Sequence, residues 1–224
     1  MPSINPYITA NPVGNTPAFV DRANILQEVL SILRDPQENV VVLYGQRRIG
    51  KTSVLQKLEA KLSEEDAYYP IFFDLQDKAQ WPLERVLQEL ADTISDGLQQ
   101  EHPNLGNAPK TAFRQVWLPQ LLNALPTDTS LVLLFDEFDV LADPQSEQAG
   151  AAFFPYLRDL LSTNPKRLNS VFVIGRNVND LTNIALSLFK KTPPIPVSLL
   201  SREDTFQLVR LSETNKSLIF DIYI

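Results

Sequence analysis

Cysteine is absent from this sequence of 224 residues, and histidine occurs only once, as His102. Without cysteine the chain can form neither a disulfide bond nor a thiolate metal site, which fits a reducing compartment. His102 precedes Pro103 in a polar stretch, so we expect a solvated side chain without a functional role. One histidine and no cysteine also argue against a zinc site.

Long apolar runs are missing as well. No stretch approaches the roughly 20 consecutive apolar residues that a membrane-spanning helix requires. The N-terminal segment, MPSINPYITANPVGNTP, has neither the basic start nor the apolar core of a signal peptide. We therefore expect a soluble cytoplasmic protein that does not associate with a membrane.

An excess of basic residues is the third absence. Lysine and arginine number 20 against 27 acidic residues, which gives a net charge of −7. Nucleic acids are polyanions, and this balance offers no basic surface to bind them. We therefore do not expect nucleic acid as a partner.

Glycine is scarce, with 7 residues in 224, yet two of them lie in one short motif. Gly45, Gly50, Lys51 and Thr52 match G-x-x-x-x-G-K-[ST], the pattern of a phosphate-binding P-loop. At average residue usage, a chain of this length matches the pattern by chance about once in a hundred times. The apolar run VVVLY precedes the motif and a helical pattern follows it, which is the context that a P-loop requires.

The chemistry of this loop indicates a nucleotide. Glycines let backbone N–H groups turn toward phosphate oxygens, and the following helix points its positive end at the same anion. Lys51 can reach the β- and γ-phosphates, and the Thr52 hydroxyl can bind Mg²⁺. We expect Arg47 and Arg48 to face solvent or a partner, although both belong to the loop. The predicted ATP-binding segment comprises Gly45, Gln46, Arg47, Arg48, Ile49, Gly50, Lys51, Thr52 and Ser53.

Two acidic residues follow the most hydrophobic strand pattern, LVLLF. Asp136 directly after this run has the layout of a Walker B carboxylate, which would hold Mg²⁺ opposite Thr52. Glu137 would then orient or deprotonate the attacking water. Asp139 is expected to be a cap or a solvated residue rather than a second metal ligand.

Arg176 ends a further strand pattern, VFVIGR. A guanidinium at this place would face the γ-phosphate and stabilise charge in the transition state. The alternative is a surface salt bridge. Asn177 and Asn179 are weaker candidates for polar contacts.

Strands and helices alternate along the chain, which predicts an α/β fold with a parallel sheet covered on both faces. The second strand carries Ile71, Phe72 and Phe73 and is expected to be buried on both faces. Pro119 should kink or split one helix, Pro155 marks a possible break in another, and Asp21 and Ser201 are expected helix caps. Strands are predicted at 40–44, 69–75, 131–135, 171–174 and, as an edge strand, within 193–198. Helices are predicted at 19–33, 50–62, 82–98, 111–125, 148–161, 179–189 and 201–211.

The motifs F-V-D-R-x-x-x-L, VVLYGQRRIGKTSVL, LVLLFDEFD and VFVIGR together resemble the AAA+-related branch of P-loop ATPases. The resemblance is closest to archaeal-type ATPases and the STAND group of signalling NTPases, and it covers about residues 5–211. It implies a P-loop NTPase three-layer sandwich with sheet order 5-1-4-3-2, and ATP rather than GTP. It also implies that the segment 19–22 packs near the adenine and that Arg176 is the sensor residue of the fourth strand.

The resemblance also suggests a division of the chain. Residues 1–18, with four of the 17 prolines, are expected to form an extended arm, and residues 19–200 the ATPase core. Relatives continue into a helical lid and a winged-helix module, so we expect 201–224 to be the start of a truncated lid with a C-terminal tail. The tail could instead add an edge strand to the sheet.

Three functions are compatible with these residues. The preferred one is an ATP-binding switch that hydrolyses ATP slowly with Mg²⁺ and passes its conformational change to an effector protein or a homo-oligomer. The second is a nucleotide-binding interaction module without hydrolysis. The third is a DNA-handling ATPase, against which the acidic balance counts.

Overall fold

The computed structural model describes residues 12–14, 16, 18–20, 22–142, 150–175 and 193–210. Its centre is a sheet of five parallel strands in the order β2-β3-β4-β1-β5, which confirms the predicted order. The strand that carries Asp136 is therefore separated from the P-loop strand by β4. The strands are β1 (Val40–Tyr44), β2 (Tyr68–Asp74), β3 (Ser130–Asp136), β4 (Leu168–Ile174) and β5 (Ile195–Pro196).

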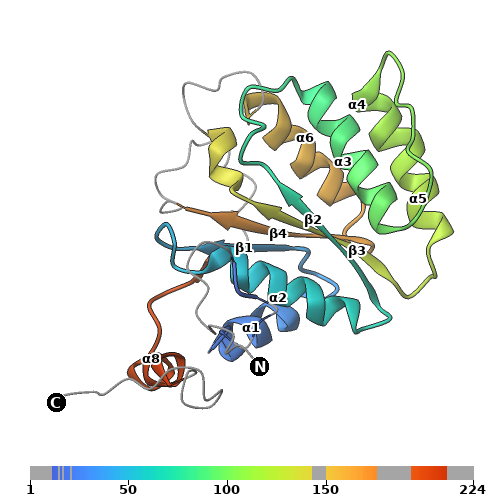
Figure 1. Ribbon diagram of the computed structural model, residues 1–224. Coiled ribbons are helices and arrows are strands. Elements are labelled where there is room, and N and C mark those ends of the chain that lie inside the picture. The colour runs from blue at the N-terminus through green and yellow to red at the C-terminus, as the bar shows by residue number, and fades with distance from the viewer. Residues whose placement is uncertain are drawn as a thin grey trace, which may run out of the picture.

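Helices cover both faces of this sheet, as Figure 1 shows: α1 and α2 pack on one face, and α3 to α6 on the other. Two apolar cores result, one on each face, because successive strand residues point to opposite sides. The α-helices are α1 (Ala23–Leu33), α2 (Lys51–Ser63), α3 (Leu83–Gly97), α4 (Pro109–Thr111), α5 (Leu118–Ala124), α6 (Gly150–Thr163) and α8 (Arg202–Val209).

Burial follows the position of each strand in the sheet. Every residue of β3 and of β4 is buried, as expected for central strands that read as continuous apolar runs. The expectation that β2 is buried on both faces was wrong, because only Ile71 and Phe73 are buried while Phe72 is half-buried. The physical reason is that β2 lies at the edge of the sheet and, among the described strands, has a neighbour on one side only.

Proline affects two helices differently. The segment predicted as one helix over 111–125 is divided into α4, the π-helix η1 (Ala112–Trp117) and α5, with Pro119 in the first turn of α5. The backbone stays helical through Trp117 and Leu118, so Pro119, which has no N–H, removes one donor from a continuous helical run. The Leu118 N–H bonds to the carbonyl of Phe113, five residues earlier. In α6 the helix continues through Pro155 without the expected break.

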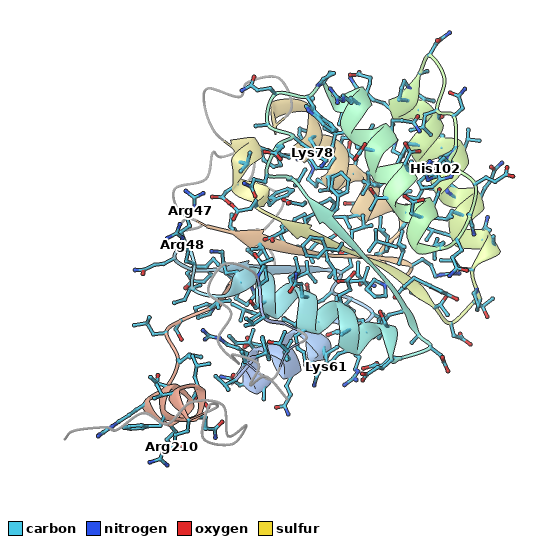
Figure 2. The ribbon with its side chains drawn as sticks, in the orientation of Figure 1. Arg47, Arg48, Lys61, Lys78, His102 and Arg210 are labelled. Atoms are coloured by element: carbon cyan, nitrogen blue, oxygen red, sulfur yellow. The ribbon has the colours of Figure 1, made fainter. Side chains whose placement is uncertain are left out.

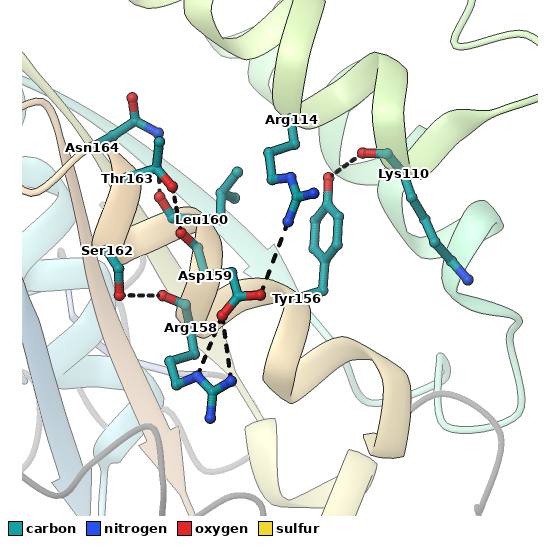
Figure 3. Close-up of polar contacts among 9 residues, drawn as sticks. All are labelled: Lys110, Arg114, Tyr156, Arg158, Asp159, Leu160, Ser162, Thr163 and Asn164. Atoms are coloured by element: carbon teal, nitrogen blue, oxygen red, sulfur yellow. Dashed lines mark hydrogen bonds and ion pairs between the residues drawn. The ribbon is translucent and has the colours of Figure 1, made fainter.

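Polar contacts join α6 to the segment formed by α4 and η1, as drawn in Figure 3. The Tyr156 hydroxyl donates to the Lys110 carbonyl at 2.9 Å, and burial raises the pKa of this phenol. Arg114 of η1 lies 3.9 Å from the Asp159 carboxylate. These contacts fix the helical layer on the α3 side of the sheet.

Other local expectations had mixed outcomes. Ser201 caps α8 through the backbone N–H of Asp204, as predicted. The helix predicted over 19–33 begins only at Ala23, and Asp21, its expected cap, lies outside the described residues. The predicted helix at 179–189 and the C-terminal tail also lie outside them. His102 is exposed, as expected, and contacts the Asp96 carboxylate at 2.6 Å.

Within the described part of the chain, no helix combines the length and apolar character needed to cross a bilayer.

Candidate nucleotide-binding site

The loop between β1 and α2 contains two residues with left-handed backbone conformation. Arg48 has φ of 64° and Gly50, which precedes α2, has φ of 99°. Gly45, at the start of the loop, lies directly against the residue that follows β5. A Cβ at Gly45 would lie 2.4 Å from the Val197 carbonyl oxygen, so no other residue type fits there without displacement. The glycines of the motif are therefore required by backbone conformation at one end and by close packing at the other.

Lys51, the first residue of α2, is buried inside this loop. Its ammonium donates to the carbonyls of Gly45 at 3.0 Å and of Gln46 at 2.9 Å. Burial lowers the pKa of Lys51, against the opposing effect of nearby carboxylates, of which Glu137 has the largest influence. Because an ammonium has three N–H donors, it can keep both carbonyl contacts and still offer one donor to a phosphate oxygen.

Thr52 and Asp136 come together from two different elements. The Thr52 hydroxyl, in the first turn of α2, lies near the carboxylate of Asp136 at the end of β3, and its interaction lowers the pKa of that carboxyl. Asp136 is buried, and desolvation raises its pKa more than Thr52 lowers it. A hydroxyl and a carboxylate near each other beside the phosphate loop fit the oxygen chemistry of Mg²⁺. Among the described residues no group of three or more acidic or histidine side chains surrounds a metal position, and nucleotide-bound Mg²⁺ takes most of its ligands from phosphates and water.

Glu137 follows in a left-handed conformation, with φ of 51°. Its backbone N–H donates to the Asp136 carboxylate at 3.0 Å, which holds the turn at the end of β3. The side chain is half-buried, and desolvation together with the Asp136 charge raises the pKa of its carboxyl. Such a turn costs about 1 kcal/mol or more for a residue with a Cβ, and strained positions of this kind concentrate at functional sites.

Of the two roles expected for Asp139, a cap or a solvated residue, the structure shows the cap. Asp139 lies in the short 3₁₀-helix η2 (Phe138–Ala142) and is 7% exposed. Its carboxylate accepts the Gly175 N–H at 3.0 Å, directly after the last residue of β4. It therefore caps a strand from another part of the chain.

Ser53 faces a segment that sequence reasoning did not connect with the site. Its hydroxyl accepts the backbone N–H of Val13 at 3.0 Å. The adjacent Gly14 packs so closely on α2 that a Cβ would lie 2.4 Å from the Ser53 carbonyl oxygen. In the sequence Gly14 stands among prolines and asparagines, and no local signal there predicts a contact some 40 residues away.

The P-loop is contacted by one buried arginine and carries two exposed ones. Arg22 is buried and precedes α1 with φ of 76°. Its guanidinium donates to the Ile49 carbonyl at 3.2 Å and thereby supports the P-loop. Arg47 and Arg48 are exposed, as expected, and Figure 2 shows them projecting from the loop at the edge of the molecule. Arg176, predicted to face the γ-phosphate, lies outside the described residues, as do Asn177 and Asn179.

Two hollows in the described part of the surface lie elsewhere. These, of about 460 and 550 Å³, open near the amino-terminal ends of the strands, with residues such as Tyr68 and Thr129 in their walls. In parallel α/β sheets the ligand crevice is found at the carboxyl ends of the strands. The predicted residues Lys51, Thr52, Asp136 and Glu137 all lie at that carboxyl edge, so chemistry and topology indicate the site.

Comparison with known proteins identifies a family for this chain. Residues 19–175 match the family described as "ATPase domain predominantly from Archaea". No protein with a curated description matches the chain.

Solved structures share the fold at low sequence identity. A Walker-type ATPase of Pyrococcus abyssi superposes with a TM-score of 0.64 at 18% identity, over 95% of this chain and 63% of that one. Domain III of the replication initiation protein DnaA from Thermotoga maritima gives 0.58 at 16% identity, over 96% and 79%. The Aeropyrum pernix ORC1 protein, solved with DNA, gives 0.58 at 17%, over 88% and 50%.

The chain thus spans less than two thirds of the Pyrococcus protein. Its sheet order and its helices on both faces are those of the AAA+ fold of P-loop ATPases. Since the family match covers well over half of the sequence, the chain belongs to the ATPase domain family found predominantly in Archaea.

Proposed function

We propose that this chain is an ATP-binding switch of the STAND kind, which hydrolyses ATP slowly with Mg²⁺ and transmits a conformational change. The observation that carries the proposal is the convergence of Lys51, Thr52, Asp136 and Glu137 at one edge of the sheet. These are the groups that phosphoryl transfer to water requires: a cation, ligands for Mg²⁺ and a base.

Each residue has a separate task in this scheme. The loop N–H groups and the Lys51 ammonium hold the β- and γ-phosphates. Thr52 and Asp136 would hold Mg²⁺, which when bound neutralises charge on the phosphate oxygens. Glu137 orients the attacking water and accepts its proton. The role proposed for Arg176 is to stabilise negative charge in the transition state.

Burial supports the assignment of Glu137 as the base. Its carboxyl is half-buried beside Asp136, and both desolvation and the neighbouring charge raise its pKa. A base works best when its pKa approaches the working pH, since its conjugate acid must be stable enough to take up the proton.

The contacts of the N-terminal segment support a route for the conformational change. Val13 and Gly14 touch Ser53, one residue after the proposed ligand Thr52, and Arg22 touches the loop at Ile49. A change in the loop on hydrolysis would therefore reach the segment 12–22 directly. We propose that an effector protein or a second copy of the chain reads this change, with 1–18 as an arm, 19–200 as the core and 201–224 as the start of a lid.

The substitution Glu137→Gln tests the proposed chemistry, because it keeps the size of the side chain and removes the base. We expect the rate of ATP hydrolysis to fall about 100-fold or more while the affinity for ATP with Mg²⁺ stays within about twofold. Phosphate release and isothermal titration measure the two quantities. Asp128→Asn, an exposed carboxylate in the loop before β3, is the matched control.

The outcomes separate the candidate functions. An unchanged hydrolysis rate in Glu137→Gln would show that Glu137 is not the base. A wild-type chain that binds ATP without turnover would be a nucleotide-binding module. A wild-type chain that binds no ATP would contradict the whole proposal.

A further inference from the structure

Asp139 stands outside the set of proposed nucleotide contacts, yet it is one of the most buried charged residues of the described chain. It is 7% exposed and lies three residues after Asp136. Burying a carboxylate is costly unless strong hydrogen bonds compensate. The structure gives it such a bond, since the carboxylate accepts the Gly175 N–H at 3.0 Å.

The segment that carries Asp139 is firmly packed. Phe138, its neighbour, is 1% exposed, and its ring centroid lies 4.5 Å from that of Phe172 on β4 and 5.9 Å from that of Phe135 on β3. The Val140 N–H donates to the Glu137 carbonyl at 3.1 Å and closes the first turn of η2. Asp139 therefore extends from a rigid support that begins at Glu137.

The Gly175 end of this contact is also closely packed. Gly175 follows Ile174, whose register partner Tyr44 is the last residue before the P-loop. A Cβ at Gly175 would lie 3.3 Å from one Asp139 carboxylate oxygen and 3.9 Å from its carboxyl carbon. The carboxylate thus packs closely against the backbone at the end of β4 as well as accepting its N–H.

We propose that Asp139 is a positioning residue for ATP hydrolysis, which holds the turn at Glu137 in place by tying η2 to the end of β4. Glu137 has a left-handed backbone, which a free turn would leave readily. The Glu137 N–H donates to the carboxylate of the preceding residue, Asp136, and the Asp139–Gly175 bond holds the chain two residues after Glu137. Because the Asp139–Gly175 bond joins η2 to the end of β4 and not to the phosphate loop, we expect its loss to affect the chemical step and not the binding of ATP.

Two substitutions separate the hydrogen bond from the charge. Asp139→Asn keeps an acceptor oxygen for the Gly175 N–H and removes the charge, while Asp139→Ala removes both. We expect kcat for ATP hydrolysis to fall about tenfold in Asp139→Ala and to stay within about threefold of wild type in Asp139→Asn, a rescue by the conservative variant. The Kd for ATP with Mg²⁺ should change less than twofold in both. Asp128→Ala removes an exposed carboxylate near the opposite end of β3 and should leave kcat and Kd as in wild type.

Amide hydrogen exchange of the apo protein provides a second readout that does not need turnover. We expect the Gly175 amide to lose protection in Asp139→Ala and to keep most of it in Asp139→Asn. Equal loss of kcat in both variants would overturn the proposal in favour of a charge effect, and loss of ATP affinity would overturn it in favour of general damage. If Asp139→Ala does not fold, Asp139→Asn with wild-type kcat and Gly175 protection supports the proposal, and Asp139→Asn with reduced kcat contradicts it.

This inference rests on the proposed function, and wild-type turnover tells the two apart. No hydrolysis by the wild type would overturn both. Hydrolysis by the wild type with an unchanged kcat in Asp139→Ala would overturn the positioning role alone.

Discussion

At the scale of single residues, the burial of Asp136 is unfavourable for the ionised form of its carboxyl. The carboxyl is buried at the end of β3, and desolvation raises its pKa more than the Thr52 hydroxyl and the Lys51 charge lower it. A folded-state pKa above the unfolded value means that folding favours the protonated form. The associated stability is complete below the unfolded pKa and is lost as the pH rises through the folded one.

We therefore predict that Asp136→Asn stabilises the protein at pH 7 when neither nucleotide nor Mg²⁺ is present. The amide resembles the protonated acid, so the free energy of unfolding should rise by about 1 kcal/mol. The gain should disappear below about pH 4, where wild type is protonated as well. Urea unfolding across this pH range measures both effects.

Asp128→Asn, at an exposed position, is the control and should change little at any pH. If Asp136→Asn were destabilising at pH 7, the Thr52 interaction and the Lys51 charge would outweigh desolvation, contrary to the order inferred from burial.

Sequence alone predicts part of this residue-level picture. The P-loop pattern identifies Lys51 and Thr52, and the apolar run before Asp136 identifies the carboxylate, because both signals are local. The bond from Asp139 to Gly175 and the contact of Gly14 with Ser53 join residues 36 and about 40 positions apart. Such contacts depend on how the strands and helices are arranged, which no short window of sequence contains.

At the scale of elements, β2 combines an exposed edge with a proline that protects it. The bonds from Ser130 N–H to the Ala67 carbonyl and from Leu75 N–H to the Asp136 carbonyl show which residues face β3. By strand alternation Pro70 faces the open edge, where it offers no N–H to another strand. Edges of this kind otherwise serve as templates for pairing between molecules.

We predict that Pro70→Val increases self-association, because it restores an edge N–H and adds a residue that favours strands. Size-exclusion chromatography with light scattering, as a function of protein concentration, should show a larger oligomeric or aggregated fraction than in wild type. Asn107→Val, which adds the same side chain to an exposed loop, should remain like wild type. Equal behaviour of both variants would mean that Pro70 does not guard the edge.

Predicting the elements from sequence succeeded where periodicity and turn chemistry agree, as for β3 and for the cap of α8 by Ser201. The burial of β2 was overestimated, because an apolar strand does not reveal whether it has one neighbour or two. The π-helix before Pro119 could not be foreseen either, since periodicity cannot separate it from an ordinary helix that ends there.

At the scale of the whole molecule, the nucleotide site connects parts that are distant in sequence. The P-loop lies between β1 and α2, the acidic residues follow β3, and Val197 after β5 contacts Gly45. A bound nucleotide would therefore stabilise the entire domain rather than one loop. Ligand binding raises the free energy of unfolding by about 2.7 kcal/mol at a concentration 100 times Kd.

We predict that ATP with Mg²⁺ at this ratio raises the Tm by about 5 to 10 °C, and that Lys51→Ala abolishes the shift because it removes the buried ammonium. Differential scanning calorimetry measures both. Lys166→Ala, an exposed lysine near the amino-terminal end of β4, should retain the shift. A shift that persists in Lys51→Ala would place the nucleotide elsewhere.

The docking of Val13 and Gly14 on Ser53 has a practical consequence for labelling. Val13 and Gly14 lie against the first turn of α2, within a few residues of the phosphate loop. A fluorophore attached by a cysteine introduced near this point would be the one such label in a chain that has no cysteine of its own. It would report nucleotide occupancy without any change to the loop itself.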